Sequence, residues 1–252
     1  MAPHQLSIEH PAEHVALLEF SRPPYNFFDA ELVASIAEAL EQLDAESSCR
    51  VLVLASTGRH FCAGANFSGD NPAGGHLYDA AGRIFEVGIP IVAAVQGAAV
   101  GGGLGVALAA DFRVATPESR FSANFARLGI HHGFGVTVTL PLVVGQQRAL
   151  EMLLTGVRLR GAEAHAIGLC DRLVPSDRLR DEAVALAGEI ATSAPLAVRS
   201  IRATMRGQDL ASRVRDAMAH EEAEQAKLFV TEDFKEGVAA YSERRPPRFQ
   251  GR

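Results

Sequence analysis

The stretch IVAAVQGAAVGGG, residues 91–103, decides the fold class of this chain. Its first five residues, Ile91–Val95, are all apolar, which is typical of a strand buried on both faces of a parallel sheet. The glycines at 97 and 101–103 predict a turn after this strand, and the apolar residues that follow predict a buried helix up to about Ala110. A strand that leads through a turn into a buried helix is the repeating unit of α/β proteins.

The same order of elements occurs upstream. Val51–Ala55 is another continuous apolar run, and the small-residue turn FCAGAN, residues 61–66, follows it. Asp29 is a good N-cap for a helix that carries Leu32, Ile36, Leu40 and Leu43 on one face. Further strands are expected at 15–20 and 112–116, and further helices at 80–87, 134–144, 147–155, 176–191, 195–206, 210–229 and 233–244. We therefore expect an α/β core over residues 1–194 and a helical region over residues 195–252.

The composition excludes several classes of protein. Of the 252 residues, 48% are hydrophobic and 21% are charged, which supplies a large core and excludes a disordered chain. The formal net charge of −6 and the low aromatic content of 6% argue against a nucleic-acid-binding protein. Three separated cysteines without a CxxC motif, and an N-terminus without a signal-peptide pattern, lead us to expect a reduced, cytoplasmic protein.

One uncharged stretch, Val87–Ala110, is 24 residues long and could therefore span a bilayer. It contains Pro90 and six glycines, which favour a buried strand, a turn and a buried helix instead. We expect no membrane partner.

The two small-residue turns are the strongest chemical signal. Each comes where a buried strand ends, and small side chains allow backbone N–H groups to approach a ligand closely. The second turn also opens a helix, whose N-terminus favours negative charge. Two N–H groups that converge on one oxygen form an oxyanion hole. Tight strand–helix packing alone explains the same residues equally well.

Other catalytic motifs are weaker or absent from the sequence. The chain has no complete G-x-G-x-x-G, no G-K-[ST], no G-x-S-x-G and no H-E-x-x-H. The adjacent pair His131 and His132 lies in a glycine-flanked loop, where an imidazole could act as an acid or a base; a surface loop is the alternative. No histidine spacing indicates a metal site. Cys62 lacks an evident base and is expected to be a packing residue.

The two turns, with their flanks FCAGANF (61–67) and IPIVAAVQG (89–97), resemble the signatures of the crotonase, or enoyl-CoA hydratase/isomerase, superfamily. Further matches are ADFRVA (110–115), LTG (154–156), AEAHAIGL (162–169), LVP (173–175) and EDFKEG (232–237), so the resemblance covers about residues 5–249. It implies a spiral of ββα repeats with a helical C-terminal region used for trimerisation. It also implies acyl-CoA thioester substrates, with coenzyme A entering as part of the substrate and no separate cofactor.

The resemblance implies roles for particular residues. The backbone N–H groups of Ala65 and Gly102 would bind the thioester oxygen and stabilise an enolate-like anion. Arg244 matches a basic position that can approach the phosphates of coenzyme A, with a solvated tail as the alternative, and Asp111 matches a structural acid. The residues that would line the coenzyme A groove are Ala63, Ala65, Asn66, Phe67 and Ser68.

Two departures from the family pattern bear on the reaction. Hydratases of the family carry two glutamates that activate water, and this chain has Gly105 and Phe125 at those positions. Neither residue can move a proton, so efficient hydration is not expected. His132 matches the region where other members place a catalytic acid, with His131 beside it, and we take His132 as the candidate acid–base group.

The sequence thus predicts an acyl-CoA-processing enzyme with an oxyanion hole and altered acid–base residues. Isomerisation, C–C cleavage and thioester hydrolysis are the candidate reactions. The alternatives are a non-catalytic acyl-CoA-binding protein and an assembly protein that uses only the trimeric fold. A homotrimer or a dimer of trimers is expected.

Overall fold

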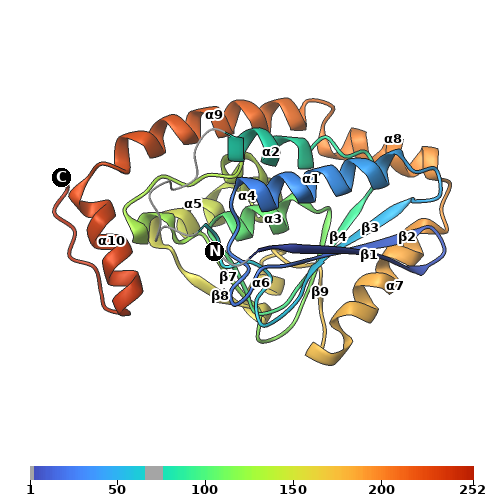
Figure 1. Ribbon diagram of the computed structural model, residues 1–252, viewed down its shortest axis with the longest axis horizontal. Helices are drawn as coiled ribbons and strands as arrows, with labels where there is room; N and C mark the ends of the chain where they lie inside the picture. Colours follow the sequence, from blue (N-terminus) through green and yellow to red (C-terminus); the bar gives the residue numbers. More distant parts are fainter. Residues whose placement is uncertain (1–2, 66–75) are drawn as a thin grey trace.

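The computed structural model describes residues 3–65 and 76–252. Its larger sheet has six strands in the order β1-β2-β3-β4-β6-β9, and all neighbours are parallel except the antiparallel pair β1 and β2 (Figure 1). The strands are β1 (Gln5–Ala12), β2 (Val15–Ser21), β3 (Val51–Ser56), β4 (Ile91–Val95), β6 (Phe112–Ala115) and β9 (Arg172–Leu173). The predicted strands β2, β3, β4 and β6 are confirmed, and β1 and β9 were not predicted.

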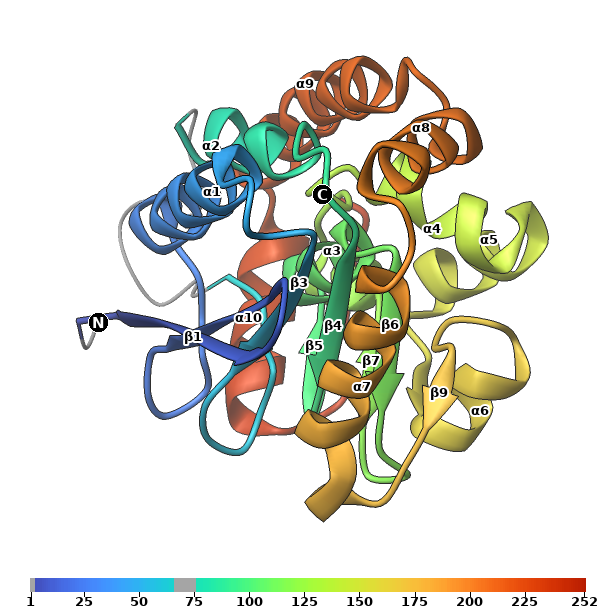
Figure 2. The same ribbon diagram turned by 90° about the vertical axis from the view of Figure 1, so that its right-hand side faces the viewer.

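The central strands are apolar throughout because helices cover both faces of this sheet. Leu52 and Leu54 pack in the main core with α1 (Ala30–Ala45), whereas Val51 and Val53 pack against α7 (Leu179–Ala191). Figure 2 shows α7 on one side of β3 and β4, with α1 and α2 (His76–Ile84) on the other. The predicted α/β class is confirmed.

A smaller sheet continues from the first. It consists of β5 (Ala98–Val100), β7 (Arg120–Ser122) and β8 (Arg158–Arg160), in that order. The chain passes from β4 to β5 through Gly97, whose φ is +57° and where an added Cβ would lie 2.0 Å from the carbonyl oxygen of Arg59. Only glycine fits this bend, which brings the two turns singled out in the sequence onto neighbouring strands.

The remaining elements are mostly helical. They are α3 (Gly102–Ala109), η1 (Asn124–Leu128), α4 (Val136–Val144), α5 (Gln146–Thr155), α6 (Gly161–Ala166), η2 (Ser176–Arg178), α8 (Pro195–Arg206), α9 (Leu210–Leu228) and α10 (Glu232–Glu243). Asp29 caps α1 as predicted, because its side chain accepts a hydrogen bond from the N–H of Leu32 at 3.0 Å. The helix predicted at 80–87 instead begins at His76 and ends at Ile84.

The stretch Val87–Ala110 forms β4, β5 and α3, as the sequence predicts, and all eight residues of α3 are buried. In the part of the chain that the structure describes, no single helix is long and apolar enough to cross a membrane, although Ser176–Ala191 and Pro195–Arg206, bent by 106°, pass such a test together on length and composition. Most residues from 195 to 243 form helices, and the proposed boundary at 194 stays a prediction.

Candidate active site

A cavity of about 1090 Å³ lies beside the two turns. Its wall combines the turns with α2, the segment 120–134, α9 and α10. Among the predicted site residues, the wall includes Ala63, Ala65, Gly102, Phe125 and Arg244. Asn66, Phe67 and Ser68 fall outside the described residues.

A parallel β-bridge between Cys62 and Ala99 aligns the two turns. The N–H of Cys62 donates to the carbonyl of Ala98 at 2.9 Å, and the N–H of Val100 donates to the carbonyl of Cys62 at 3.1 Å. A Cβ added at Gly64 would lie 2.8 Å from the carbonyl oxygen of Val100. The turns are therefore in backbone contact, with no room for a side chain between them.

Both predicted N–H donors belong to the backbone of the two turns. Within the described residues, neither the N–H of Ala65 nor that of Gly102 donates a hydrogen bond. Gly102 is the first residue of α3, so its N–H also carries the positive end of the helix dipole. An added Cβ at Gly64 would lie only 3.9 Å from the nitrogen of Gly102, which brings the first turn close to this donor. Such free donors at a cavity wall suit an oxygen that develops negative charge.

Aromatic side chains surround this place. The ring of Phe28 packs so closely on Gly102 that a Cβ there would lie 2.3 Å from Cζ of Phe28. The rings of Phe28 and Phe134 have centroids 5.5 Å apart. A Cβ at Gly105 would lie 2.7 Å from Cβ of Phe134, so Phe134 fills the space that a longer side chain at position 105 would need. Together with Phe125, these rings make the inner wall apolar.

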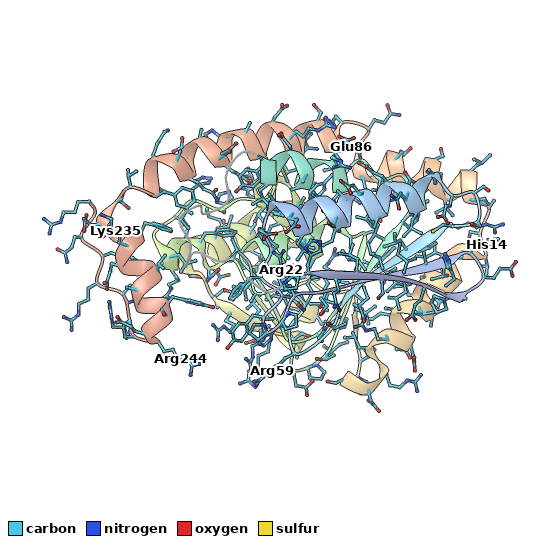
Figure 3. All side chains as sticks on the ribbon, viewed as in Figure 1. His14, Arg22, Arg59, Glu86, Lys235 and Arg244 are labelled. Carbon is cyan, nitrogen blue, oxygen red and sulfur yellow. The ribbon has the colours of Figure 1, made fainter. Side chains whose placement is uncertain are left out.

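The outer wall is basic. Five arginines line the cavity. Arg245 pairs with Glu236 and Glu243, whereas the other four form no ion pair with a described residue: Arg59, Arg120, Arg158 and Arg244. Figure 3 shows Arg59 and Arg244 on the same edge of the molecule. No Asp or Glu occurs among the described residues that line the cavity. Unpaired guanidinium groups around one opening favour an anionic ligand.

The two histidines of the 129–135 loop lie outside this wall. His132 packs edge-on against Phe125, with ring centroids 6.3 Å apart, and its Nε2 lies 2.8 Å from Oγ1 of Thr137. The Thr137 hydroxyl donates to the buried carboxylate of Glu221, so it must accept a hydrogen bond from Nε2–H of His132. His131 stacks on His132 and hydrogen-bonds its carbonyl at 2.8 Å. Neither imidazole is among the described wall residues.

This environment opposes a positive charge on His132. Burial, followed by the nearby His131 and His220, lowers the pKa of His132 from 6.5 to about 4, and these effects outweigh the Glu221 carboxylate, which lies 3.9 Å from Nε2. Burial also raises the pKa of Glu221, against the hydrogen bonds that Thr137 and Gly135 donate to its carboxylate. The network fixes the loop to α9 rather than presenting a titrating group to the cavity.

We expect the contribution of His132 to stability to be lost as the pH falls from 6.5 to 4, because the unfolded chain protonates this residue first, whereas the raised pKa of Glu221 acts in the opposite sense. The contribution of this residue is on the order of 3 kcal/mol. Urea unfolding at several pH values should show a smaller loss for His132→Ala than for wild type across this window. Equal losses in the two proteins would contradict the assigned environment.

Sequence reasoning missed several wall residues, among them Tyr25, Tyr78, Asn124, Gln225 and the arginines at 59, 120 and 158. Arg59 lies two residues before the first turn begins, and this position could have indicated it. Cys62 is buried, and burial raises the pKa of its thiol to about 12, which agrees with its predicted packing role. No group of three or more potential metal ligands occurs in residues 3–65 and 76–252.

Comparison with known proteins gives consistent results. A family model described as enoyl-CoA hydratase/isomerase matches residues 11–252. A probable enoyl-CoA hydratase of Rhizobium meliloti is 34% identical over 246 residues, which are 94% of this chain and 95% of that protein. An (E)-benzylidenesuccinyl-CoA hydratase of Thauera aromatica is 33% identical over 95% of this chain and 97% of its own length.

Solved structures share the fold over nearly the whole chain. An enoyl-CoA hydratase/isomerase of Pseudoalteromonas atlantica superposes with a TM-score of 0.87 at 31% identity and covers 97% of this chain and 99% of that one. A carnitinyl-CoA dehydratase of Mycobacterium avium superposes with a TM-score of 0.86 at 28% identity, over 98% and 99% of the two chains.

Proposed function

Because the chain belongs to the enoyl-CoA hydratase/isomerase family, the crotonase superfamily, we propose that its cavity binds an acyl-CoA thioester and stabilises an enolate-like anion of it. The observation that carries the proposal is the pair of N–H groups, on Ala65 and Gly102, that lie in the wall of one cavity and donate to no described residue. Their hydrogen bonds would strengthen as negative charge develops on the thioester oxygen. The arginines of the outer wall would bind the phosphates of coenzyme A.

The reaction itself is proposed to differ from simple hydration. Gly105 lies under Phe134, and Phe125 is part of the apolar wall, so neither position offers a carboxylate. Water activation of the hydratase type needs such groups. Isomerisation, C–C cleavage and thioester hydrolysis remain the candidates. Acyl-CoA binding without turnover is the second candidate function, and the lack of acidic side chains among the described wall residues favours it.

For His132 we propose a positioning role rather than direct proton transfer. Its ring lies behind Phe125 and is bonded to Thr137. The variant His132→Ala should then keep turnover within about threefold of wild type at neutral pH, as expected for a group that does not itself transfer a proton. A much larger fall in kcat, with the melting temperature unchanged, would restore the acid–base assignment.

The experiment that tests the proposed function is a binding measurement followed by a turnover screen. Coenzyme A and acetyl-CoA should raise the melting temperature of the protein, and mass spectrometry should identify which acyl-CoA thioesters it converts. Difference infrared spectra of acetyl-CoA, isotope-labelled at the carbonyl carbon, should show a lower carbonyl frequency when bound. The absence of binding would overturn the proposal, and binding without any conversion would support the second candidate.

We also propose that copies of the chain cover α8. No residue of this helix is buried, and Leu196, Ile201 and Met205 are exposed by 81%, 63% and 80%. Surface apolar groups of this size on one helix indicate a protein interface. The family resemblance leads us to expect a homotrimer or a dimer of trimers.

The double variant Leu196→Glu/Met205→Glu should therefore dissociate the protein. Light scattering coupled to size-exclusion chromatography should give a trimer or hexamer for wild type and a smaller species for the variant. Ile8→Glu, on the exposed strand β1, serves as the matched control and should leave the mass unchanged. A monomeric wild type would contradict the proposal.

The absence of a separate cofactor and the cytoplasmic location stay predictions.

A further inference from the structure

The cavity wall also holds a polar pair that the proposed chemistry does not use. Tyr78 comes from α2 and Gln225 from α9, two helices that run side by side (Figures 1 and 2). The Tyr78 hydroxyl donates to Oε1 of Gln225 at 2.8 Å. The two residues are only 8% and 5% exposed, and both line the cavity. Burying two polar side chains in an otherwise apolar wall is unfavourable unless their hydrogen bonds are made.

The loop that precedes α4 is shaped around this pair. Nε2 of Gln225 donates to the carbonyl of His131 at 3.0 Å. A Cβ at Gly133 would lie 2.1 Å from the Tyr78 hydroxyl oxygen and 2.6 Å from Nε2 of Gln225. Gly133 is not among the positive-φ glycines, so the backbone conformation does not require a glycine here. The steric fit to Tyr78 and Gln225 does. The glycine thus keeps room for the hydroxyl and the amide at the cavity wall.

An apolar path joins this pair to the proposed oxyanion hole. The ring of Phe28 covers Gly102 and packs against Phe134, the residue next to Gly133. An acyl chain whose thioester oxygen is bound at Gly102 would run along these rings, and its far end would meet Tyr78. The wall is therefore hydrophobic along these rings and polar at Tyr78 and Gln225.

The pair can accept and donate hydrogen bonds without ionising. Burial, and next the charge of Glu221, raises the pKa of Tyr78, whereas the bond to Gln225 opposes this shift. The phenol therefore stays neutral, which makes it a poor base but a good hydrogen-bonding group. Its oxygen can accept from a ligand hydroxyl, and the second amide hydrogen of Gln225 can donate to the same hydroxyl.

We propose that Tyr78 and Gln225 bind an oxygen at the end of the acyl group remote from the thioester, and that the preferred substrates are acyl-CoA thioesters with a hydroxyl there. This inference rests on the proposed function, because it requires the thioester to lie at Gly102. A plain hydrocarbon end would leave the Tyr78–Gln225 bond intact but would gain no hydrogen bond from the pair. One net hydrogen bond corresponds to about a 3- to 10-fold difference in affinity.

The test compares matched ligands by calorimetric titration, with no need for turnover. Acyl-CoA thioesters of increasing chain length are titrated beside their counterparts with a terminal hydroxyl. Wild type should bind at least one hydroxylated thioester about 3- to 10-fold more tightly than the plain thioester of equal length. Tyr78→Phe should abolish this preference while keeping the affinity for plain acyl-CoA. Tyr25→Phe, at another part of the wall, should retain the preference.

A second variant approaches the pair from the loop. In Gly133→Ala the new methyl group must displace the Tyr78 hydroxyl, so the preference should also be lost. A wild type without preference at any chain length, or a Tyr78→Phe variant that retains it, would overturn the inference while leaving the proposed function intact. Failure of every thioester to bind would overturn the proposed function and this inference with it.

Discussion

A protein that carries Gly102→Pro together with Phe28→Ala should turn over its acyl-CoA substrate with a kcat/KM about 100- to 1000-fold below that of Phe28→Ala alone. The proline removes one of the two N–H donors, and the loss of a single oxyanion-hole donor has an effect of about this size. No substitution other than proline removes this donor, because every other amino acid keeps its backbone N–H. The measurement is steady-state kinetics on the thioester identified in the turnover screen.

The structure indicates why a proline is tolerated at this position. Gly102 is the first residue of α3, where a proline is favoured because its missing N–H has no partner in the helix. Gly101 has φ +57° and ψ −125°, outside the helical region that a following proline disfavours. Phe28 must be shortened because its Cζ would lie 2.3 Å from a Cβ at position 102.

The matched control is Gly102→Ala with Phe28→Ala, which adds a similar Cβ but keeps the N–H. It should lie within a few-fold of Phe28→Ala, and equal losses in the alanine and proline variants would assign the effect to sterics. If the protein binds thioesters without converting them, the infrared carbonyl shift of bound acetyl-CoA serves as the readout. That shift should shrink only in the proline variant.

The sequence predicted well those elements whose burial produces a local pattern of apolar residues. β3 and β4 are apolar at every position because α1 and α7 cover opposite faces of the sheet. β1 has no such pattern because nearly all of it is exposed. β7 and β8 are only three residues long and contain arginines, so their residues give no period to recognise.

For the site as well, the local features could be predicted from the sequence and the long-range contacts could not. The two turns are local sequence features, and the bridge between Cys62 and Ala99 brings them together. Tyr78 and Gln225 are 147 residues apart, and the residues that flank each of them form no motif that indicates a site. Their meeting depends on how α2 packs on α9. The sequence also could not indicate that His132 faces Thr137 and Glu221 rather than the cavity, because this depends on a contact with α9.

The substitution Asp111→Ala should cost about 3–5 kcal/mol of unfolding free energy, a large part of the ~5–15 kcal/mol typical of a folded domain. The Asp111 carboxylate is 11% exposed and accepts hydrogen bonds from Arg202 at 2.8 Å, from Arg206 at 3.0 Å and from the N–H of Ile91 at 2.8 Å. This carboxylate joins α8 to the start of β4, which agrees with the structural role expected for Asp111.

The cost arises from the charges that remain. Burial lowers the pKa of Arg206, and Asp111 opposes that shift, so removing the carboxylate leaves two partly buried guanidinium groups beside each other without their partner. Replacing Arg202 and Arg206 by leucine in the Asp111→Leu background should therefore recover much of the stability, because an apolar cluster can substitute for a buried ion pair.

Urea unfolding of wild type, Asp111→Ala and the leucine triple variant measures these differences in unfolding free energy. Glu232→Gln, which breaks an exposed ion pair with Lys235, serves as the control and should have no measurable effect. If Asp111→Ala and Glu232→Gln behave alike, the ion pairs of Asp111 do not hold α8. If Asp111→Ala is destabilised but the leucine triple variant is not rescued, the cost lies in the lost bond to Ile91 instead. A loosened α8 should also weaken the proposed trimer, because its exposed apolar residues would no longer be held in register for a second copy.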